Sequence, residues 1–200
     1  ALRLRGTGGY QQADALRTQQ AIWWEQGDWD SQGYPVEAQA IYGDSALTDM
    51  GLLAGSPIVL AGADTVWDVP QAGLTLDSAY FFLTHAGAQE VVFVGGHRRY
   101  DSLTLQNRFT LLADSNAFGM LTAPGGHSLS LAGGQGQAVD SLRLLGDCTA
   151  PVFLRSPFPT EPPARLRKTG HDTLALQHVV IDHVQANLSH GATYLATEAA

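Results

Sequence analysis

The sequence contains few charged residues and almost no lysine. Asp, Glu, Lys and Arg make up 15% of its 200 residues, against about 25% in an ordinary soluble domain. There are 11 Lys and Arg and 19 Asp and Glu, so the formal net charge is −8, and Lys168 is the single lysine. An acidic, lysine-poor chain is a poor partner for a phosphate backbone. The composition therefore predicts no nucleic-acid binding.

Cysteine and long apolar runs are scarce as well. Cys148 is the single cysteine, and one cysteine forms neither an intramolecular disulfide nor a thiolate metal site. No run approaches the ~18 apolar residues of a transmembrane helix, so we expect no membrane insertion. The opening residues ALRLRGTGGY contain no initiator methionine and no apolar signal core. We expect the chain to be a segment of a longer protein, with any targeting signal outside it.

What the chain does contain is a succession of short strand signals. From about residue 57 onwards, apolar segments of three to five residues are bounded by Gly, Pro, Asp or Asn, a pattern typical of β-strands and turns. No helical period of useful length interrupts them. The hydrophobic content of 44% is enough for a sizeable core. The sequence therefore predicts an all-β fold.

The first fifty residues have a different character. Residues 11–24 are the only stretch with a composition typical of a helix, and Trp23, Trp24 and Trp29 fall within seven residues. Large aromatic side chains are usually buried, so we interpret the cluster as core filling or as the cover of an open end. A binding platform is the alternative. We divide the chain into residues 1–50, an irregular aromatic-rich region that caps the fold or ends a preceding module, and residues 51–200, the coils of the main fold.

A Leu-x-Leu motif recurs through the second part and places two leucines on one face of a strand. Most steps between successive copies are close to the length of one coil of a parallel β-helix, about 20 to 30 residues. The step from Leu129 to Leu142 is clearly shorter and fits a move to the next face within one coil. We predict a right-handed parallel β-helix, with a β-sandwich as the alternative. The motif occupies residues 74–76, 103–105, 129–131, 142–144 and 174–176.

Residues 101–196 carry a further series of elements in a defined order. A Gly-x-Cys element is followed by an apolar strand that ends on Ser, a Pro/Thr-rich loop, a Val-x-Ile-x-Asp type strand and a Gly-Ala-Thr-aromatic element. In this order the series resembles the repetitive β-strand modules of large secreted surface proteins of Bacteroidota. The elements are Gly146–Cys148, Pro151–Ser156, Pro157–Pro163, Val179–Asp182 and His190–Tyr194.

The resemblance implies a right-handed parallel β-helix in a secreted or cell-surface protein. Proteins of this kind often use the type IX secretion route and serve adhesion, gliding or substrate attachment. The partners it implies are neighbouring modules of the same polypeptide, together with a carbohydrate or another cell surface. It implies no catalytic residues, because the shared pattern is strand and turn chemistry.

Seven histidines raise the question of a metal site. In an extended strand, His178 and Asp182 share one face while His183 points to the other, and such a pair begins a zinc site only if a neighbouring coil adds a ligand. We interpret the histidines instead as surface residues that flank turns. They are His85, His97, His127, His171, His178, His183 and His190.

The acidic residues of the second part form no local cluster of the kind that pectate-lyase-like enzymes use to hold calcium. Most occupy turn positions, where Asp is favoured for local hydrogen bonding. Pairing of carboxylates across coils, as in a glycosidase, stays open because separation in space decides it. Arg98 and Arg99 fit a clamp for an anionic sugar, although a solvated turn is our interpretation. The carboxylates are Asp101, Asp114, Asp140, Asp147, Asp172 and Asp182.

The glycine-rich pieces and the cysteine also receive structural interpretations. Gly125–Gly126 and Gly133–Gly136 lack the Lys-Ser/Thr and the helix of a phosphate-binding loop, so we predict tight turns with positive φ. Cys148 lies beside Asp147 with no obvious base nearby. Because a nucleophilic thiol needs a basic or positive neighbour, we predict a buried structural thiol.

We therefore predict no catalytic, cofactor-binding or metal-binding residue and no cofactor. The predicted function is a non-catalytic structural or adhesive module of a large secreted or cell-surface protein, whose loops contact a surface or a carbohydrate. Two alternatives from other classes stay open. One is a polysaccharide lyase or glycosidase on the same fold, and the other is a carbohydrate-binding module that uses the tryptophans.

Overall fold

The chain winds as a β-solenoid. A computed structural model describes residues 1–6, 8–43, 50–53, 55–69, 74–76, 78–158, 160–171 and 174–187. These residues form 23 strands and no helix, so among them there is no helix able to cross a membrane. All paired strands are parallel. The predicted parallel β-helix is confirmed, and the β-sandwich alternative, which requires antiparallel sheets, is wrong.

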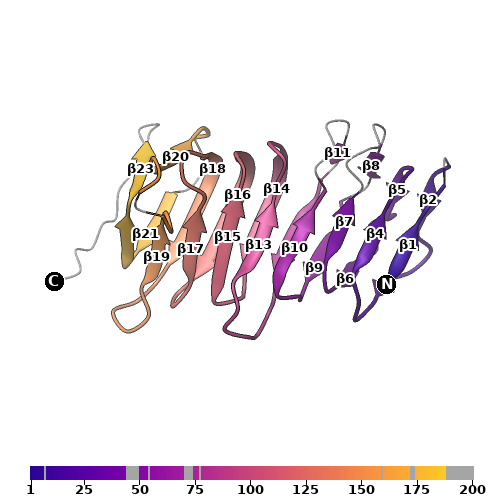
Figure 1. Ribbon diagram of the computed structural model, residues 1–200, viewed down its shortest axis with the longest axis horizontal. Helices are drawn as coiled ribbons and strands as arrows, with labels where there is room; N and C mark the ends of the chain where they lie inside the picture. Colours follow the sequence, from indigo (N-terminus) through magenta and orange to yellow (C-terminus); the bar gives the residue numbers. More distant parts are fainter. Residues whose placement is uncertain are drawn as a thin grey trace.

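One face of the solenoid is a nine-stranded sheet, here called sheet A (Figure 1). Neighbours in this sheet are separated in sequence by a whole coil, so each coil adds one strand to it. Its strands are β1 (Leu2–Leu4), β4 (Ile22–Trp24), β7 (Ile41–Gly43), β10 (Asp64–Asp68), β13 (Val91–Val94), β15 (Phe109–Ala113), β17 (Ser128–Leu131), β19 (Val152–Arg155) and β22 (Val179–Asp182).

Two further sheets complete the coils. Sheet B has four strands and ends with β11, whereas the ten-stranded sheet C continues along the solenoid. Sheet B contains β2 (Tyr10–Gln11), β5 (Trp29–Asp30), β8 (Met50–Leu53) and β11 (Leu74–Leu76). Sheet C contains β3 (Leu16–Arg17), β6 (Val36–Ala38), β9 (Pro57–Leu60), β12 (Tyr80–Leu83), β14 (Arg99–Leu105), β16 (Asn116–Pro124), β18 (Gly136–Leu145), β20 (Ala164–Lys168) and β23 (Val184–Asn187), and β21 (Leu174–Gln177) also pairs with β18.

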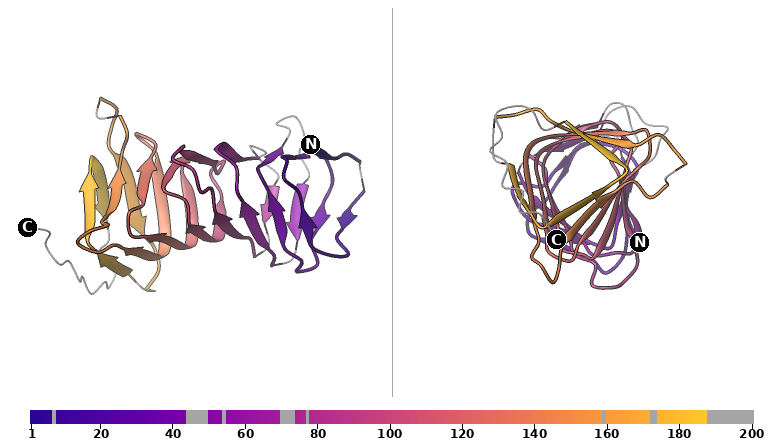
Figure 2. Two further views of the ribbon diagram at one scale, coloured as in Figure 1. Left: turned by 90° about the horizontal axis from the view of Figure 1, so that it is seen from below. Right: turned by 90° about the vertical axis from the view of Figure 1, so that its left-hand side faces the viewer.

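Seen along its length, the chain encloses one continuous interior (Figure 2). Coil length varies around it. A long coil leads from Asp64 to its partner Val91, whereas two clearly shorter coils lead from Val91 to Thr110 and from Thr110 to Leu129. The strands keep a common register, so the difference in length is taken up by the connections at the corners. The shortest coils therefore have the tightest corners.

The interior of the middle coils is filled by an aromatic cluster. Its members come from sheets A and C, and each is at most 1% exposed. Their ring centroids lie 4.7 to 6.4 Å apart, mostly edge to face, the arrangement that aromatic quadrupoles favour. The buried hydroxyl of Tyr100 accepts from Trp67 Nε1 at 3.1 Å and donates to the Gly95 carbonyl at 2.6 Å. We call this set the aromatic cluster: Trp67, Phe81, Phe93, Tyr100 and Phe118.

Beyond the aromatic cluster, leucines stack from coil to coil. Leu103 pairs with Leu121, Leu121 with Leu142, and Leu142 with Leu174. The last of these pairs joins two of the predicted Leu-x-Leu motifs. The short step between the motifs that begin at Leu129 and Leu142 connects β17 in sheet A to β18 in sheet C, so the predicted move to another face within one coil is confirmed.

Residues 1–50 differ from what their composition predicts. The helix-like stretch 11–24 is extended chain with strands β2, β3 and β4, because alternate side chains there are needed to fill the coil interior. The first coil, β1 to β3, pairs in register with the second, β4 to β6. The region therefore belongs to the solenoid, and its described strands, of two or three residues each, are too short to show a clear alternation.

The tryptophans of this region lie in the second coil and do not cover the end of the solenoid. Trp24 and Trp29 are buried and meet edge to face at 5.8 Å, which confirms core filling for these two. Trp23 is 38% exposed and its ring contacts Tyr42 and the Arg3 guanidinium. A platform made of all three tryptophans is therefore not available to a ligand.

Candidate functional site

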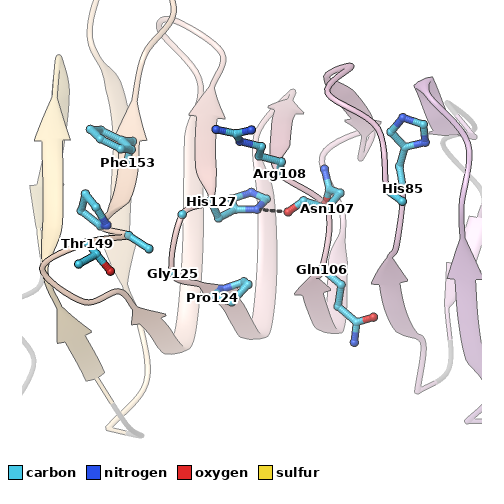
Figure 3. A pocket seen from close by; sticks show the side chains of 13 residues that line it. His85, Gln106, Asn107, Arg108, Pro124, Gly125, His127, Thr149 and Phe153 are labelled. Carbon is cyan, nitrogen blue, oxygen red and sulfur yellow. Dashed lines mark hydrogen bonds between the residues drawn. The ribbon is translucent and has the colours of Figure 1, made fainter.

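A groove runs along the corner at which sheet C leads into sheet A. The connections 106–108 and 125–127 have three residues each, whereas the connections 84–90 and 146–151 on either side are longer. Two short connections between two longer ones leave a hollow of about 520 Å³, which we call the corner groove. It is lined by His85, Ala86, Gln106, Asn107, Arg108, Pro124, Gly125, Gly126, His127, Thr149, Ala150, Pro151 and Phe153 (Figure 3).

The floor of the corner groove is held by hydrogen bonds within a coil and between successive coils. The Asn107 backbone N–H donates to the Leu83 carbonyl at 3.1 Å, and its side-chain amide donates to the Thr110 hydroxyl at 2.9 Å. One coil further on, the backbone N–H of Gly126 donates to the Ala150 carbonyl at 2.9 Å. Gly126 has a φ of +76°, which confirms the predicted tight turn. The tight corners are thus a built feature of the local sequence.

Two histidines of the corner groove present their Nε2 atoms without a partner. Nδ1 of His127 lies 2.6 Å from the Asn107 carbonyl, and Nδ1 of His85 lies 3.3 Å from the Ala61 carbonyl. A carbonyl only accepts, so Nδ1 is the protonated nitrogen and Nε2 of the neutral ring carries a lone pair. Both Nε2 atoms are buried and have no hydrogen-bond partner among the described residues.

His127 is held in its neutral form. Its side chain is 1% exposed, and burial lowers its pKa, opposed only by the hydrogen bond to Asn107. A neutral imidazole at neutral pH is a hydrogen-bond acceptor at Nε2. The expected surface position is therefore wrong for His127, and the residue supplies an unsatisfied acceptor at the groove floor instead.

The corner groove has a distinctive charge and an aromatic surface. Among the described residues that line it, none is acidic and Arg108 is the single permanently charged one. The Arg108 guanidinium lies 5.4 Å from the centroid of the Phe109 ring and makes no salt bridge within the described part of the chain. Phe153 is 43% exposed. Figure 3 shows Phe153, His127, Arg108 and His85 following one another along the solenoid.

Cys148 lies at the edge of the groove, next to Thr149. The thiol is exposed, so the predicted buried position is wrong. The reason is a turn in which the Asp147 carboxylate accepts from the Thr149 N–H and hydroxyl and the Ala150 N–H, all within 2.8 Å. These hydrogen bonds lower the pKa of Asp147 and direct the intervening Cys148 side chain outwards.

The other histidines do not assemble a metal site. Within the described ranges no group of three His, Cys, Asp or Glu is placed to hold a metal. His178 and His183 have φ values of +45° and +53° and stand at the turns that flank strand β22, as predicted, so the extended geometry holds for residues 179–182 but not for the two histidines. His97, at φ +62°, also flanks a turn, as predicted. His190 and Asp172 lie outside the described residues.

The arginine pair is divided between two structural contacts. Arg98 is half-buried and Nη1 donates to the Val69 carbonyl at 2.7 Å, while Arg99 meets Asp140 at 2.6 Å. Two guanidinium groups already engaged in this way make a poor clamp for a sugar. Arg99 is exposed, as a solvated turn requires, but Arg98 is not free in solvent.

One interaction between carboxylates across coils was not evident from the sequence. Burial raises the pKa of Asp68 and the charge of Asp114 raises it further. Asp114 itself accepts from the Gly96 N–H at 3.1 Å. The two aspartates are far apart in the sequence, and only the register of the coils brings them near each other. Asp101, Asp140 and Asp182 belong to different places along the solenoid and join neither this pair nor the corner groove.

Comparison of the chain with protein-family models, with curated proteins and with solved structures finds no match.

Proposed function

We propose that this chain is a non-catalytic structural module of a secreted or cell-surface protein that contacts carbohydrate through the corner groove. The observation that carries the proposal is the unsatisfied Nε2 of the buried His127. A buried polar atom without a partner is uncommon, and a sugar hydroxyl is a donor of the right kind. Phe153 offers an exposed ring beside it, and a ring face with convergent polar groups is typical of ligand sites.

The chemistry of the groove favours binding over cleavage. Glycoside hydrolysis uses two carboxyl groups about 5 to 10 Å apart, and the described residues that line the groove include no carboxylate. It supplies instead the side-chain amide of Gln106, which both donates and accepts, and the Thr149 hydroxyl oxygen and the His127 imidazole as acceptors. These groups hold a glycan without acting on it.

The partners in this proposal are neighbouring modules of the same polypeptide as well as a glycan. The outer edges of β1, β2 and β3 pair with no strand among the described residues. Beside them Tyr10 has a buried hydroxyl without a described partner, and an unpaired parallel edge is a template for a further strand. A preceding coil would pair with this edge.

Calorimetric titration with a panel of neutral and acidic oligosaccharides tests the carbohydrate proposal. We expect binding by the wild type, a loss of about tenfold or more in affinity for Phe153→Ala, and no loss for Phe158→Ala. Phe158 is the matched control because it is 53% exposed and lies outside the groove. Absence of binding to every glycan, or equal affinities for the two variants, would overturn the proposal.

A polysaccharide-cleaving enzyme is the second candidate, and Asp68 is the observation in its favour. A carboxyl group with a raised pKa beside an ionised one is the arrangement of a general acid and its partner. This candidate requires release of reducing ends or unsaturated products from the same panel, and loss of that turnover in Asp68→Asn and Asp114→Asn. Binding without turnover contradicts it.

A further inference from the structure

The charge of the corner groove is opposite to that of the chain as a whole. The sequence has 19 acidic and 11 basic residues, yet the lining of the groove, as far as the structure describes it, contains one arginine and no Asp or Glu. The imbalance has a regional origin. Residues 1–97 contain 3 basic and 11 acidic residues, whereas residues 98–200 contain 8 of each. Most of the groove lies in the second, electrically balanced region, where an anion meets little long-range repulsion.

Arg108 is the one arginine among the described residues that line the corner groove. In the described part of the chain, four other arginines are paired with carboxylates: Arg3 and Arg5 with Glu25, Arg17 with Glu37, and Arg99 with Asp140. The Arg108 guanidinium instead contacts the Phe109 ring, a contact that leaves the N–H groups at its edge available. A planar guanidinium binds carboxylates and sulfates through two parallel hydrogen bonds.

Resting on the proposed function, we infer that the ligand of the corner groove is an acidic glycan and that Arg108 binds its anionic group. Arg108 and His127 then recognise different groups of the ligand. The neutral His127 presents a lone pair, which attracts a hydroxyl and repels an anion. The anionic group therefore belongs at Arg108, and the hydroxyls of the same or the next sugar belong at His127. Phe153 is left to stack on an apolar ring face.

The decisive comparison uses oligogalacturonate and its methyl ester, which share a backbone and differ in charge. Calorimetry at low salt is expected to show the acid binding about tenfold more tightly than the ester, as for a hydrogen bond to a charged group. Arg108→Gln should lower the affinity for the acid to that for the ester and remove its salt dependence.

The control variant is Arg143→Gln, which removes the same charge from an exposed position outside the groove and should leave the preference for the acid unchanged. Because Arg108 and Arg143 are both exposed, neither variant is expected to perturb the fold, and far-ultraviolet dichroism checks this.

The outcomes separate this inference from the proposed function. Equal affinity for acid and ester, with no effect of Arg108→Gln, overturns the acidic-glycan inference while carbohydrate binding stands. No binding of any oligosaccharide overturns both. A second titration uses a sulfated galactan oligosaccharide. If it binds more tightly than oligogalacturonate and Arg108→Gln removes this binding, the result supports the inference and assigns the anion as sulfate. An equal loss in Arg143→Gln would mean that only net charge matters, and it would overturn the role of Arg108.

Discussion

The two parts of the solenoid on either side of residue 97 share one architecture but differ in strand length and charge. Described strands of the first part have two to five residues, while β14, β16 and β18 of the second have 7, 9 and 10. The first part also contains the whole formal net charge of −8. The fold needs only inward apolar side chains and a common register, so composition and coil size vary freely around it.

The side chains that fill the interior also change from the first part to the second. All four tryptophans lie in the first part, the aromatic cluster lies at the junction, and leucines such as Leu129, Leu142 and Leu154 fill the coils beyond it. Because coils of a solenoid contact only their neighbours, the two parts are coupled by the β12–β14 and β13–β15 strand pairs and by the aromatic cluster packed between them. Each prediction below changes one part and uses the other as its reference.

The largest effect is expected for Trp67→Ala. The Trp67 side chain is fully buried and contacts Phe81, Phe93 and Tyr100, so its removal should lower the free energy of unfolding by about 3–5 kcal/mol. It should also uncouple the two parts. Tryptophan fluorescence, which reports only the first part, and far-ultraviolet dichroism, which reports both, should then give different guanidinium midpoints.

The control for Trp67→Ala is Trp23→Ala, at an exposed position where the expected loss is below about 1 kcal/mol. In this variant and in the wild type the two probes should give the same midpoint. Coincident probes in Trp67→Ala, or a small loss of stability, would contradict a coupling role for the aromatic cluster.

The fold of the second part was predictable because its residues repeat the period of the structure. Each Leu-x-Leu motif puts two leucines on one face, and pairs such as Leu142 and Leu174 occupy the same register position. In the first part the inward positions hold tryptophan, valine and alanine on very short strands, so composition there pointed to a helix or to irregular chain.

The corner groove could not be predicted, since it depends on the lengths of neighbouring connections. Once the coil period is known, the short coils from Ile22 to Ile41, from Val91 to Thr110 and on to Leu129 mark tight corners, but the groove forms only where longer connections flank them. The buried state of His127 and the outward Cys148 depend on hydrogen bonds to backbone atoms, which side-chain identity does not specify. The Asp68–Asp114 interaction likewise requires the register of the coils.

Glycine-to-alanine substitutions should have the next largest effect on stability, and they should destabilise a corner of the first part more than a corner of the second. Gly27 has a φ of +86°, and an added Cβ would lie 2.3 Å from the Gly8 carbonyl oxygen, whereas at Gly126, with φ +76°, the nearest atom would be 3.7 Å away. Gly126→Ala should therefore cost only the positive-φ penalty of about 1–2 kcal/mol, and Gly27→Ala clearly more. Guanidinium unfolding of both variants measures the difference. Equal losses would mean that the first-part corner relaxes around the new methyl group.

Acidification should affect the two parts in opposite directions. The folded-state pKa of His127 is lowered by burial, so the unfolded chain binds the proton more readily and stability falls as pH drops through about 6.5. The folded-state pKa of Asp68 is raised by burial and by Asp114, so the folded chain binds the proton more readily than the unfolded chain. The first part therefore gains stability as the pH falls toward that raised pKa. His127→Gln should flatten the loss of stability below about pH 6.5, and Asp68→Asn should flatten the gain that acidification brings to the first part. Unchanged pH profiles in both variants would contradict these assignments.

The smallest effect is expected where exposed ion pairs cross between coils. Arg99 and Asp140 meet at 2.6 Å in the second part, and Arg17 and Glu37 at 3.3 Å in the first. Both arginines are more than half exposed, so Arg99→Gln and Arg17→Gln should each lower the free energy of unfolding by less than about 1 kcal/mol, and added salt should reduce both effects. Asp140 also accepts from the Thr169 hydroxyl at 2.6 Å, which orients its carboxylate toward Arg99, and we therefore expect the larger loss for Arg99→Gln. Urea titrations at low and high salt measure this difference. A larger loss for Arg17→Gln would show that the net negative charge of the first part, rather than the geometry of a single pair, decides what an arginine contributes.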